Sequence, residues 1–276
     1  PATTEIYTLS LHNAIPISMT NGLTLGGLYV FEEEIIKSLS AITGENILRG
    51  DLKLRDALTL WSTAAIGFFS GMLADRIGVK KLMVTGMVIL SACFYFYGQA
   101  QSLVDMYILH IFMGLVLCIS GMIVNVILIT KWFNNSRGLA IGILLAGTSV
   151  GNGIFPQINA YLLSIGDWRE VMLWLSLIPL CYIPFLLLLV KESPEALNQE
   201  NQEIDQDFSQ TNNSGGLTLK EALSTKNFWL LSLMAFCTFY SILAMTGHVF
   251  LLMIEENSRQ VRSEEHTSEL QSRETI

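Results

Sequence analysis

Seven long apolar stretches constrain the fold of this chain more than any other feature of its sequence. They cover Ile6–Phe31, Ala57–Ala74, Leu82–Val104, Met106–Thr130, Gly138–Gly166, Val171–Val190 and Asn227–Ile254, and none contains Asp, Glu, Lys or Arg. A helix of about 20 apolar residues crosses the hydrocarbon core of a bilayer, where one central charge costs about 2.5–3.5 kcal/mol. The stretches are continuous rather than alternating, which favours helices over a membrane barrel. We therefore predict an all-α, polytopic membrane protein.

Composition supports this class and argues against others. The chain is 51% hydrophobic and 14% charged, with a mean hydropathy of +0.47, whereas soluble domains are about 25% charged. The net charge of −8 comes from acids in residues 192–207 and in the C-terminal tail, so we expect no nucleic-acid partner. The four cysteines lie in separate apolar stretches without metal-ligand spacing, and we predict no metal site, disulfide or cofactor.

Lysine and arginine positions set the expected orientation. With the N-terminus in the cytoplasm, eight of these residues lie inside and five outside. This excess of cytoplasmic lysine and arginine agrees with the positive-inside rule. The inner set is Arg76, Lys80, Lys81, Lys131, Arg137, Lys191, Lys220 and Lys226, and the outer set is Lys37, Arg49, Lys53, Arg55 and Arg169. We predict a multi-pass protein of the plasma or inner membrane with a cytoplasmic N-terminus.

Changes in composition divide the chain into four segments. Residues 1–191 hold six predicted spans, 192–226 form a polar linker, 227–254 form the seventh span, and 255–276 form a short loop and tail. The linker is rich in Glu, Gln, Asn and Ser, which is typical of a flexible cytoplasmic connection. Residues Arg262–Ser272 match the in-frame translation of a common sequencing adapter, so we expect the natural reading frame to stop before Arg262; a genuine polar tail is the alternative.

A charged, glycine-containing motif connects the second and third predicted spans. It reads Gly71-Met72-Leu73-Ala74-Asp75-Arg76-Ile77-Gly78-Val79-Lys80-Lys81-Leu82. Gly71 permits close approach of another backbone, Gly78 permits a tight turn, and Asp75 can accept charge-assisted hydrogen bonds. A basic loop punctuated by glycine is the simpler interpretation, but the combined spacing is much harder to obtain by chance.

This motif resembles the loop signature of the major facilitator superfamily and departs from it only at Val79. Six spans, a linker and a further span are also similar to that superfamily's six-plus-six arrangement. The resemblance implies an N-terminal six-helix bundle followed by a seventh helix, in a carrier that works by alternating access. It also implies that this chain is a fragment of such a carrier. The implied cytoplasmic gate consists of Gly71, Asp75, Arg76, Gly78, Lys80 and Lys81, with Asp75 contacting a helix of the second bundle.

Two further stretches resemble monocarboxylate and oxalate/formate-type porters. The first looks like their fifth helix and contains Arg137, Gly138, Gly142, Gly147, Gly151 and Pro156. The second, Leu217–Leu223 followed by Asn227–Leu231, is similar to the entry into their seventh helix. In the fourth span His110 takes the position of an arginine usual in that group. The resemblance implies a symporter or antiporter for a small organic anion.

Polar and small residues recur at helical spacing on one face of three spans. The three sets are His110, Gly114, Cys118, Gly121 and Asn125; Ser18, Gly22, Gly26, Tyr29 and Glu33; and Cys237, Ser241, Ala244 and His248. Transporters built from repeats bind solute near the bilayer midplane between bundles. We therefore select Asn21, Tyr29, His110, Asn125, Asn152 and His248 as solute or coupling candidates, and the two histidines for proton coupling. For the glycines and cysteines helix packing is the role we favour, whereas for His110 and His248 packing and function are weighed equally.

Three consecutive acids, Glu32-Glu33-Glu34, follow the first span. The interpretation we favour is three solvated acids at headgroup level. The alternative is that Glu33, by its helix face, points into a cavity as a proton acceptor. Asp105 and Asp167 lie at outer boundaries of spans and are predicted helix caps.

One enzymatic alternative rests on Gly147-Thr148-Ser149-Val150-Gly151, which fits the G-x-S-x-G motif of hydrolases. That motif requires a strand-turn-helix context, whereas here it lies within an apolar span whose glycine spacings suit helix packing. We predict a transporter rather than an enzyme, with the lipid bilayer, a small solute and protons as partners and an unspecified oligomeric state. An intramembrane hydrolase using Ser149 and a transport-inactive sensor or scaffold are the alternatives.

Overall fold

The computed structural model describes residues 14–132, 137–190, 219–241 and 245. Residues 6–13 of the first predicted span, most of the linker, His248 and the adapter-like tail lie outside the described residues. The chain divides into two compact units, residues 1–202 and 203–276, and each is described by itself. Every regular element among the described residues is helical, which confirms the all-α prediction.

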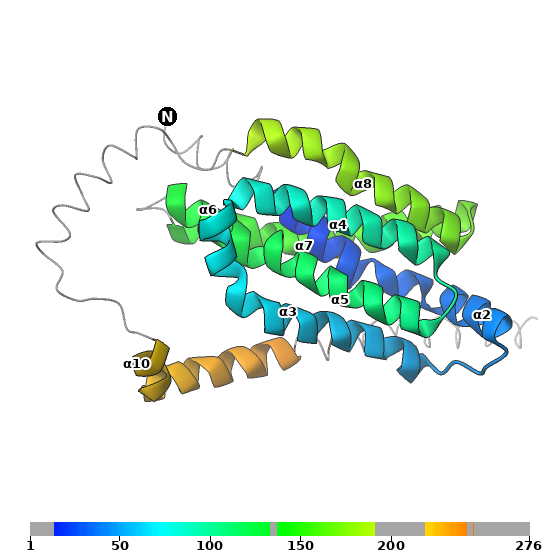
Figure 1. The fold of residues 1–276 in the computed structure, drawn as a ribbon, viewed down its shortest axis with the longest axis horizontal. Helices are drawn as coiled ribbons and strands as arrows, with labels where there is room; N and C mark the ends of the chain where they lie inside the picture. The colour runs from blue at the N-terminus through cyan, green and yellow to red at the C-terminus, as the bar shows by residue number, and fades with distance from the viewer. Residues whose placement is uncertain (1–13, 133–136, 191–218, 242–244, 246–276) are drawn as a thin grey trace, which may run out of the picture. The chain divides into compact units, whose positions relative to one another are not determined.

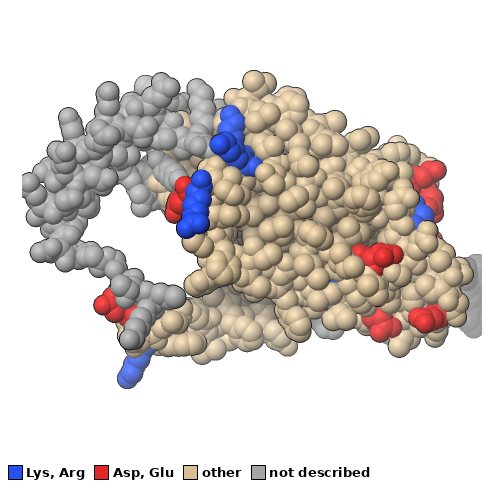
Figure 2. All heavy atoms as spheres, in the orientation of Figure 1, with Lys and Arg blue, Asp and Glu red and all other residues tan. Residues whose placement is uncertain are grey.

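Five helices of the first unit are long and apolar enough to cross a membrane, among the residues searched. They are α3 (Arg49–Ile77), α4 (Val79–Gln99), the segment Leu103–Thr130 made of α5 (Leu103–Ile119) and α6 (Met122–Trp132), α7 (Arg137–Ile165) and α8 (Trp168–Leu189). On the face drawn in Figure 2, Lys and Arg gather at one end of this bundle and Asp and Glu mainly at the other, with uncharged surface between them. That distribution suits a hydrocarbon environment around the middle of the bundle.

The core of the unit is organised around α4. This helix packs between α8 and α5, and α3 packs against α5 (Figure 1). Its inner face is a stripe of fully buried side chains at helical spacing: Met83, Met87, Leu90, Phe94 and Tyr97. Where α4 meets the middle of the fourth span, a Cβ on Gly86 would lie 2.5 Å from Ser120 Cβ, so this contact requires glycine.

The first span is not the continuous α-helix that was predicted. Residues 14–21 are α-helical, η1 (Gly22–Gly26) is a π-helical turn, and η2 (Leu28–Phe31) is a 3₁₀ turn that leads into α2 (Glu32–Thr43). Thr20 Oγ1 donates to Pro16 O over 3.0 Å, and Thr24 Oγ1 donates to Thr20 O. Such hydroxyl bonds compete with the backbone ladder, and the glycines of this segment weaken helix propensity further.

The fourth span is broken between α5 and α6 at Ser120-Gly121. Asn125 Nδ2 donates to Ser120 O over 3.0 Å and to Gly121 O over 2.8 Å, which satisfies carbonyl oxygens at the break. A glycine and a serine at a kink are a recognised cause of helix bending. The predicted single helix is therefore a kinked pair, and the side chain of Asn125 is engaged by its own backbone.

Helix boundaries differ from prediction at α3 and α5. Helix α3 begins at Arg49, eight residues before the predicted span, where Leu48 N donates to Asp51 Oδ2 over 3.0 Å. Helix α5 is capped by Ser102, and Asp105, the third residue of the helix, completes a capping box with it, so the prediction of Asp105 as the cap is wrong by three residues. Asp167 does cap α8, accepting from Arg169 N over 3.1 Å.

Two turns depend on glycine in the left-handed region. Gly44 ends α2 with φ +72°, and Gly78 joins α3 to α4 with φ +92°. Residues that carry a side chain rarely adopt such backbone φ angles. The prediction of a tight turn at Gly78 is confirmed.

The second unit is described over a short stretch. Helix α10 (Leu219–Ser224) is followed by a helix over residues 226–241. Trp229 Nε1 donates to Leu223 O over 2.9 Å, which fastens the connection between them. The predicted seventh span is thus helical over its described part.

Candidate functional site

The first unit buries a cluster of charged and polar side chains centred on Arg55 of α3. The Arg55 side chain is 0% exposed. Its Nη1 donates to Tyr97 Oη of α4 over 2.6 Å, and its Nη2 donates to Glu32 Oε1 of α2 over 3.2 Å. A buried charge requires such partners because its desolvation cost is several kcal/mol. The cluster therefore joins three helices at the end of the bundle where α2 lies (Figure 1).

Glu32 is shared by three cations. Besides Arg55, its carboxylate accepts from Lys53 Nζ and lies 3.5 Å from Arg49 Nε. Lys53 also lies 4.0 Å from the centre of the Tyr29 ring, an arrangement that stabilises a cation over an aromatic face. This contact connects the sequence-predicted Tyr29 to the cluster.

Asp56 supplies the second carboxylate of the cluster. Its Oδ2 lies 3.5 Å from Lys53 Nζ, and its Oδ1 lies 3.3 Å from Arg55 Nε. The Nε–H of Arg55 is nevertheless buried without a hydrogen-bond partner. One donor of the central guanidinium is therefore left unsatisfied.

His110 of α5 closes a ring of hydrogen bonds with the same residues. Its Nδ1 lies 2.8 Å from Thr59 Oγ1 and its Nε2 lies 3.3 Å from Tyr97 Oη, while Thr59 Oγ1 donates to Arg55 O over 3.3 Å. Tyr97 accepts from Arg55 and can donate its own proton to Nε2, and the hydroxyl proton of Thr59 is already directed to Arg55 O, so a neutral imidazole carries its proton on Nδ1 toward Thr59. The neutral Nδ1–H tautomer of His110 satisfies every hydrogen bond of this ring.

The three consecutive acids separate into different environments. Glu32 is 3% exposed and belongs to the cluster, whereas Glu33 is exposed. Glu34 pairs with Lys37 over 2.9 Å at the surface, and this hydrogen bond raises the pKa of Lys37. The favoured interpretation, three solvated acids, is wrong for Glu32, which is buried. The alternative, in which Glu33 points inward, is also wrong, because it extrapolated regular α-helical spacing through the π-helical and 3₁₀ turns of η1 and η2.

The other predicted solute candidates are placed apart from the cluster. Asn21 Nδ2 donates to Ile17 O of its own helix over 3.1 Å, and Asn125 is likewise bonded to its own backbone. Asn152 of α7 is exposed and lies against the backbone of Gly26. His248 lies outside the described residues. Among the predicted set, the structure brings Tyr29 and His110 to one site.

The predicted gate motif lies around the α3–α4 turn. Asp75, Arg76 and Lys81 are exposed, and Lys80 Nζ donates to Leu187 O of α8 over 2.5 Å. A Cβ on Gly71 would meet nothing within 4 Å in the described part of the chain. The gate function of the motif stays a prediction.

Glycines of α7 fall into two classes. A Cβ on Gly147 would lie 2.8 Å from Ala14 Cβ, and one on Gly151 would overlap Ser18 of the first span, whereas Gly138 and Gly142 meet nothing within 4 Å. Ser18 Oγ reinforces the contact by donating to Gly147 O over 2.6 Å. Pro156 lies inside the same helix, and the side chain of Arg137 lies outside the described residues.

Ser149 is exposed in the middle of α7, with none of the strand-turn context that a nucleophile elbow needs.

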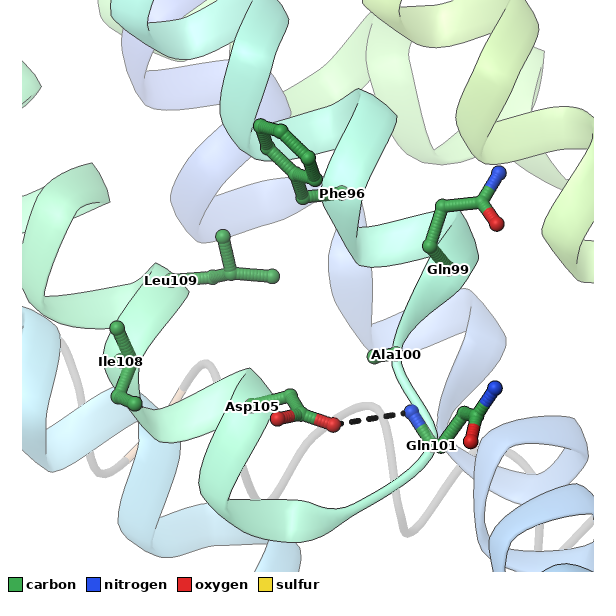
Figure 3. Close-up of a pocket in the computed structure, with 7 residues that line it drawn as sticks. All are labelled: Phe96, Gln99, Ala100, Gln101, Asp105, Ile108 and Leu109. Carbon is green, nitrogen blue, oxygen red and sulfur yellow. Dashed lines mark hydrogen bonds between the residues drawn. The ribbon is translucent and has the colours of Figure 1, made fainter.

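A hollow of about 370 Å³ lies beside the α4–α5 turn and is lined by Phe96, Gln99, Ala100, Gln101, Asp105, Ile108 and Leu109 (Figure 3). Asp105 Oδ2 accepts from the backbone N–H groups of Gln101 and Ser102 over 3.1 and 3.0 Å. The carboxylate therefore serves the helix start, and the other polar side chains of the lining are the uncharged Gln99 and Gln101. The buried cluster around Arg55 is the stronger candidate site.

Sequence analysis missed the members of the cluster other than Tyr29 and His110. The sequence pattern places Arg55 in an outer loop when every charged residue is treated as the end of a span. Leu52, Arg55 and Thr59 are all buried and stand at i, i+3 and i+7. That helical spacing was the available signal that the buried face of α3 begins before Ala57, on its N-terminal side.

A bundle of apolar helices long enough to cross a bilayer, with its charges paired inside or placed at its ends, defines an integral multi-pass membrane protein. The model of the Major Facilitator Superfamily matches residues 22–259, and the chain belongs to that family.

Three relatives are named as transporters. The chain is 30% identical over 138 residues to the gallate transporter of Pseudomonas putida, 26% identical over 165 residues to the sialic acid transporter NanX of Escherichia coli K12, and 23% identical over 168 residues to the uncharacterized transporter YhjX of the same organism. The matches cover 48%, 57% and 60% of this chain but 30%, 40% and 39% of the relatives. The chain thus spans well under half the length of these relatives.

Proposed function

We propose that this chain forms part of a secondary transporter that moves a small organic anion by alternating access. The observation that carries the proposal is the buried Arg55 cluster within a bundle of membrane-capable helices. An ionisable group at such a position marks a functional site more often than a structural one. Family membership supports the transport class, and the two solutes named for relatives, gallate and sialic acid, both bear a carboxylate.

The proposal extends to subgroup and orientation. We assign the chain to the monocarboxylate and oxalate/formate-type porters on the motifs of the fifth and seventh spans. The N-terminus lies in the cytoplasm, which places the α3–α4 turn inside and the α2–α3 connection outside. Tyr29 and His110, with Asn21, Asn125, Asn152 and His248, then lie along the transport path or beside it.

Uptake by the full-length gene product in proteoliposomes tests the proposal. We expect saturable uptake of labelled monocarboxylates such as benzoate, and no uptake of uncharged amides of the same size, such as benzamide. The amide is a matched control because it retains shape and apolar area without the charge. Equal uptake of acid and amide, or no saturable uptake of any carboxylate, would refute the organic-anion assignment.

Proton coupling is proposed to involve His110 and His248. In the hydrogen-bond ring both nitrogens of His110 are engaged, so taking up a proton requires Tyr97 to turn its hydroxyl away from Nε2. We expect His110→Gln and His248→Gln each to weaken the pH dependence of uptake. Uptake that is equally pH-dependent in both variants and in the native protein would remove the histidines from the mechanism.

A further inference from the structure

We infer that Arg55 binds the carboxylate of a small organic monoanion, which takes the place of Glu32 at the guanidinium. The inference deepens the proposed function and rests on it. The starting observation is a charge imbalance: the ion pairs of the cluster contain three cations, Arg49, Lys53 and Arg55, but only two carboxylates, Glu32 and Asp56. With His110 neutral in its ring, the cluster holds one uncompensated positive charge.

Nearby acids do not remove this imbalance through direct pairing. Glu33 is exposed, Glu34 pairs with Lys37, and Asp51 accepts from the backbone of Leu48. Arg49 and Lys53 are 41% and 38% exposed, so solvent screens them, whereas Arg55 is 0% exposed. Since screening is weakest for buried charges, the attraction for an anion is greatest at Arg55.

The guanidinium also has donors to spare. Its described hydrogen bonds are one to the neutral Tyr97 phenol and one to Glu32, while Nε–H makes no hydrogen bond and faces Asp56 Oδ1 at 3.3 Å as an ion pair. The Nε and Nη2 groups of an arginine form a planar edge that matches the two oxygens of a carboxylate. A planar monoanion fits this edge better than a spherical ion does.

Glu32 can leave Arg55 without losing its other partners. The same carboxylate contacts Lys53 and Arg49, and its distance to Arg55 Nη2 is 3.2 Å. Glu32 is the first residue of α2 and directly follows the 3₁₀ turn η2. In this exchange the solute carboxylate replaces Glu32 at Arg55 Nη2, while Glu32 keeps its contacts with Lys53 and Arg49.

The test measures equilibrium binding of ¹⁴C-benzoate to the purified chain in detergent, with unlabelled benzoate, benzamide and chloride as competitors. We expect competition by benzoate alone. Glu32→Gln should tighten benzoate binding roughly tenfold because the internal competitor has lost its charge. Arg55→Lys should weaken binding roughly tenfold because it retains the charge but loses the planar edge.

Two further variants control for folding. Arg169→Lys changes another arginine, which donates to Gly98 O and Ala100 O outside the cluster, and should leave binding unchanged. The double variant E32Q/R55Q removes one charge of each sign and should retain helical content and a monodisperse gel-filtration peak, yet bind no benzoate. Benzoate binding by this double variant, absence of binding by the native chain, or equal competition by chloride or benzamide would each overturn the inference.

Uptake by the full-length gene product separates this inference from the proposed function. Saturable carboxylate uptake that persists in E32Q/R55Q would refute the Arg55 binding site but would leave the proposed transport function supported. Arg55-dependent binding in a protein that carries no solute would leave the site standing and refute transport.

Discussion

The contact between the first span and α7 provides the sharpest test of the bundle. An alanine Cβ at position 151 would lie 2.8 Å from Ser18 C and Cα, and closer still to Ser18 O, whereas ordinary contacts are 3.4–4 Å. Gly142 lies in the same helix and has nothing within 4 Å. Gly151→Ala and Gly142→Ala are therefore the same chemical change in the same element, and they differ in what the added methyl group meets.

The expected magnitudes follow from three effects. Overpacking a close contact costs about 1–3 kcal/mol, and losing the interhelical bond from Ser18 Oγ to Gly147 O costs about 0.6 kcal/mol. Alanine is favoured over glycine in a helix interior by about 0.8–1.0 kcal/mol. We expect Gly151→Ala to lower the free energy of unfolding by about 1–2.5 kcal/mol and Gly142→Ala to raise it by about 1 kcal/mol.

Reversible unfolding by SDS in mixed micelles, followed by far-UV circular dichroism, measures both variants against the native chain. The difference between them, about 2–3.5 kcal/mol, exceeds the error of such extrapolations. If the two substitutions shift the free energy of unfolding in the same direction by the same amount, the first span does not pack against α7 as described.

Three further predictions concern the cluster, a cap and the topology. Tyr97→Phe leaves the Nη1 donor of the buried guanidinium without its acceptor and should lower the free energy of unfolding by about 1–3 kcal/mol. Tyr95→Phe, at a half-exposed side chain, should change it little. Equal effects of the two substitutions in the SDS titration would contradict the hydrogen bond between Arg55 and Tyr97. Ser102→Ala removes the α5 cap and should cost about 1 kcal/mol in the same titration; an unchanged midpoint would show that the cap is dispensable. Cysteines introduced at Glu45 and Arg76 should differ in labelling of intact cells by an impermeant maleimide, with only position 45 reacting, and the reverse pattern would invert the orientation.

The spans could be predicted from sequence because their signal is local. A window of about 20 apolar residues without a charge predicts a spanning helix from hydration cost alone, and α4, α7 and α8 lie close to their predicted ranges. The helix breaks at η1 and at Ser120-Gly121 were harder to predict. They depend on which hydroxyl or amide side chain bonds to the backbone, and on how closely a neighbouring helix approaches.

The cluster could not be predicted from local windows because its partners are distant in sequence. Arg55 is 23 residues from Glu32 and 42 from Tyr97, and Thr59 is 51 residues from His110. A rule that penalises charge within a span excludes Arg55, since the rule has no knowledge of a partner carboxylate on another helix. His110 was selected because an ionisable group inside an apolar stretch is visible without any partner.

Stability alone does not account for the buried charges. Replacing a buried ion pair with neutral groups of similar volume is often neutral or stabilising, whereas removing one partner costs about 3–5 kcal/mol. The guanidinium of Arg55 has an unsatisfied Nε–H and shares Glu32 with two other cations, so its pairing is poorer than a purely structural ion pair requires. An apolar contact between α2, α3 and α4 would hold these helices together at lower desolvation cost. A cation with a spare donor and an exchangeable carboxylate gains its physical advantage when a second anion arrives, and for that reason we connect the cluster to solute binding rather than to folding.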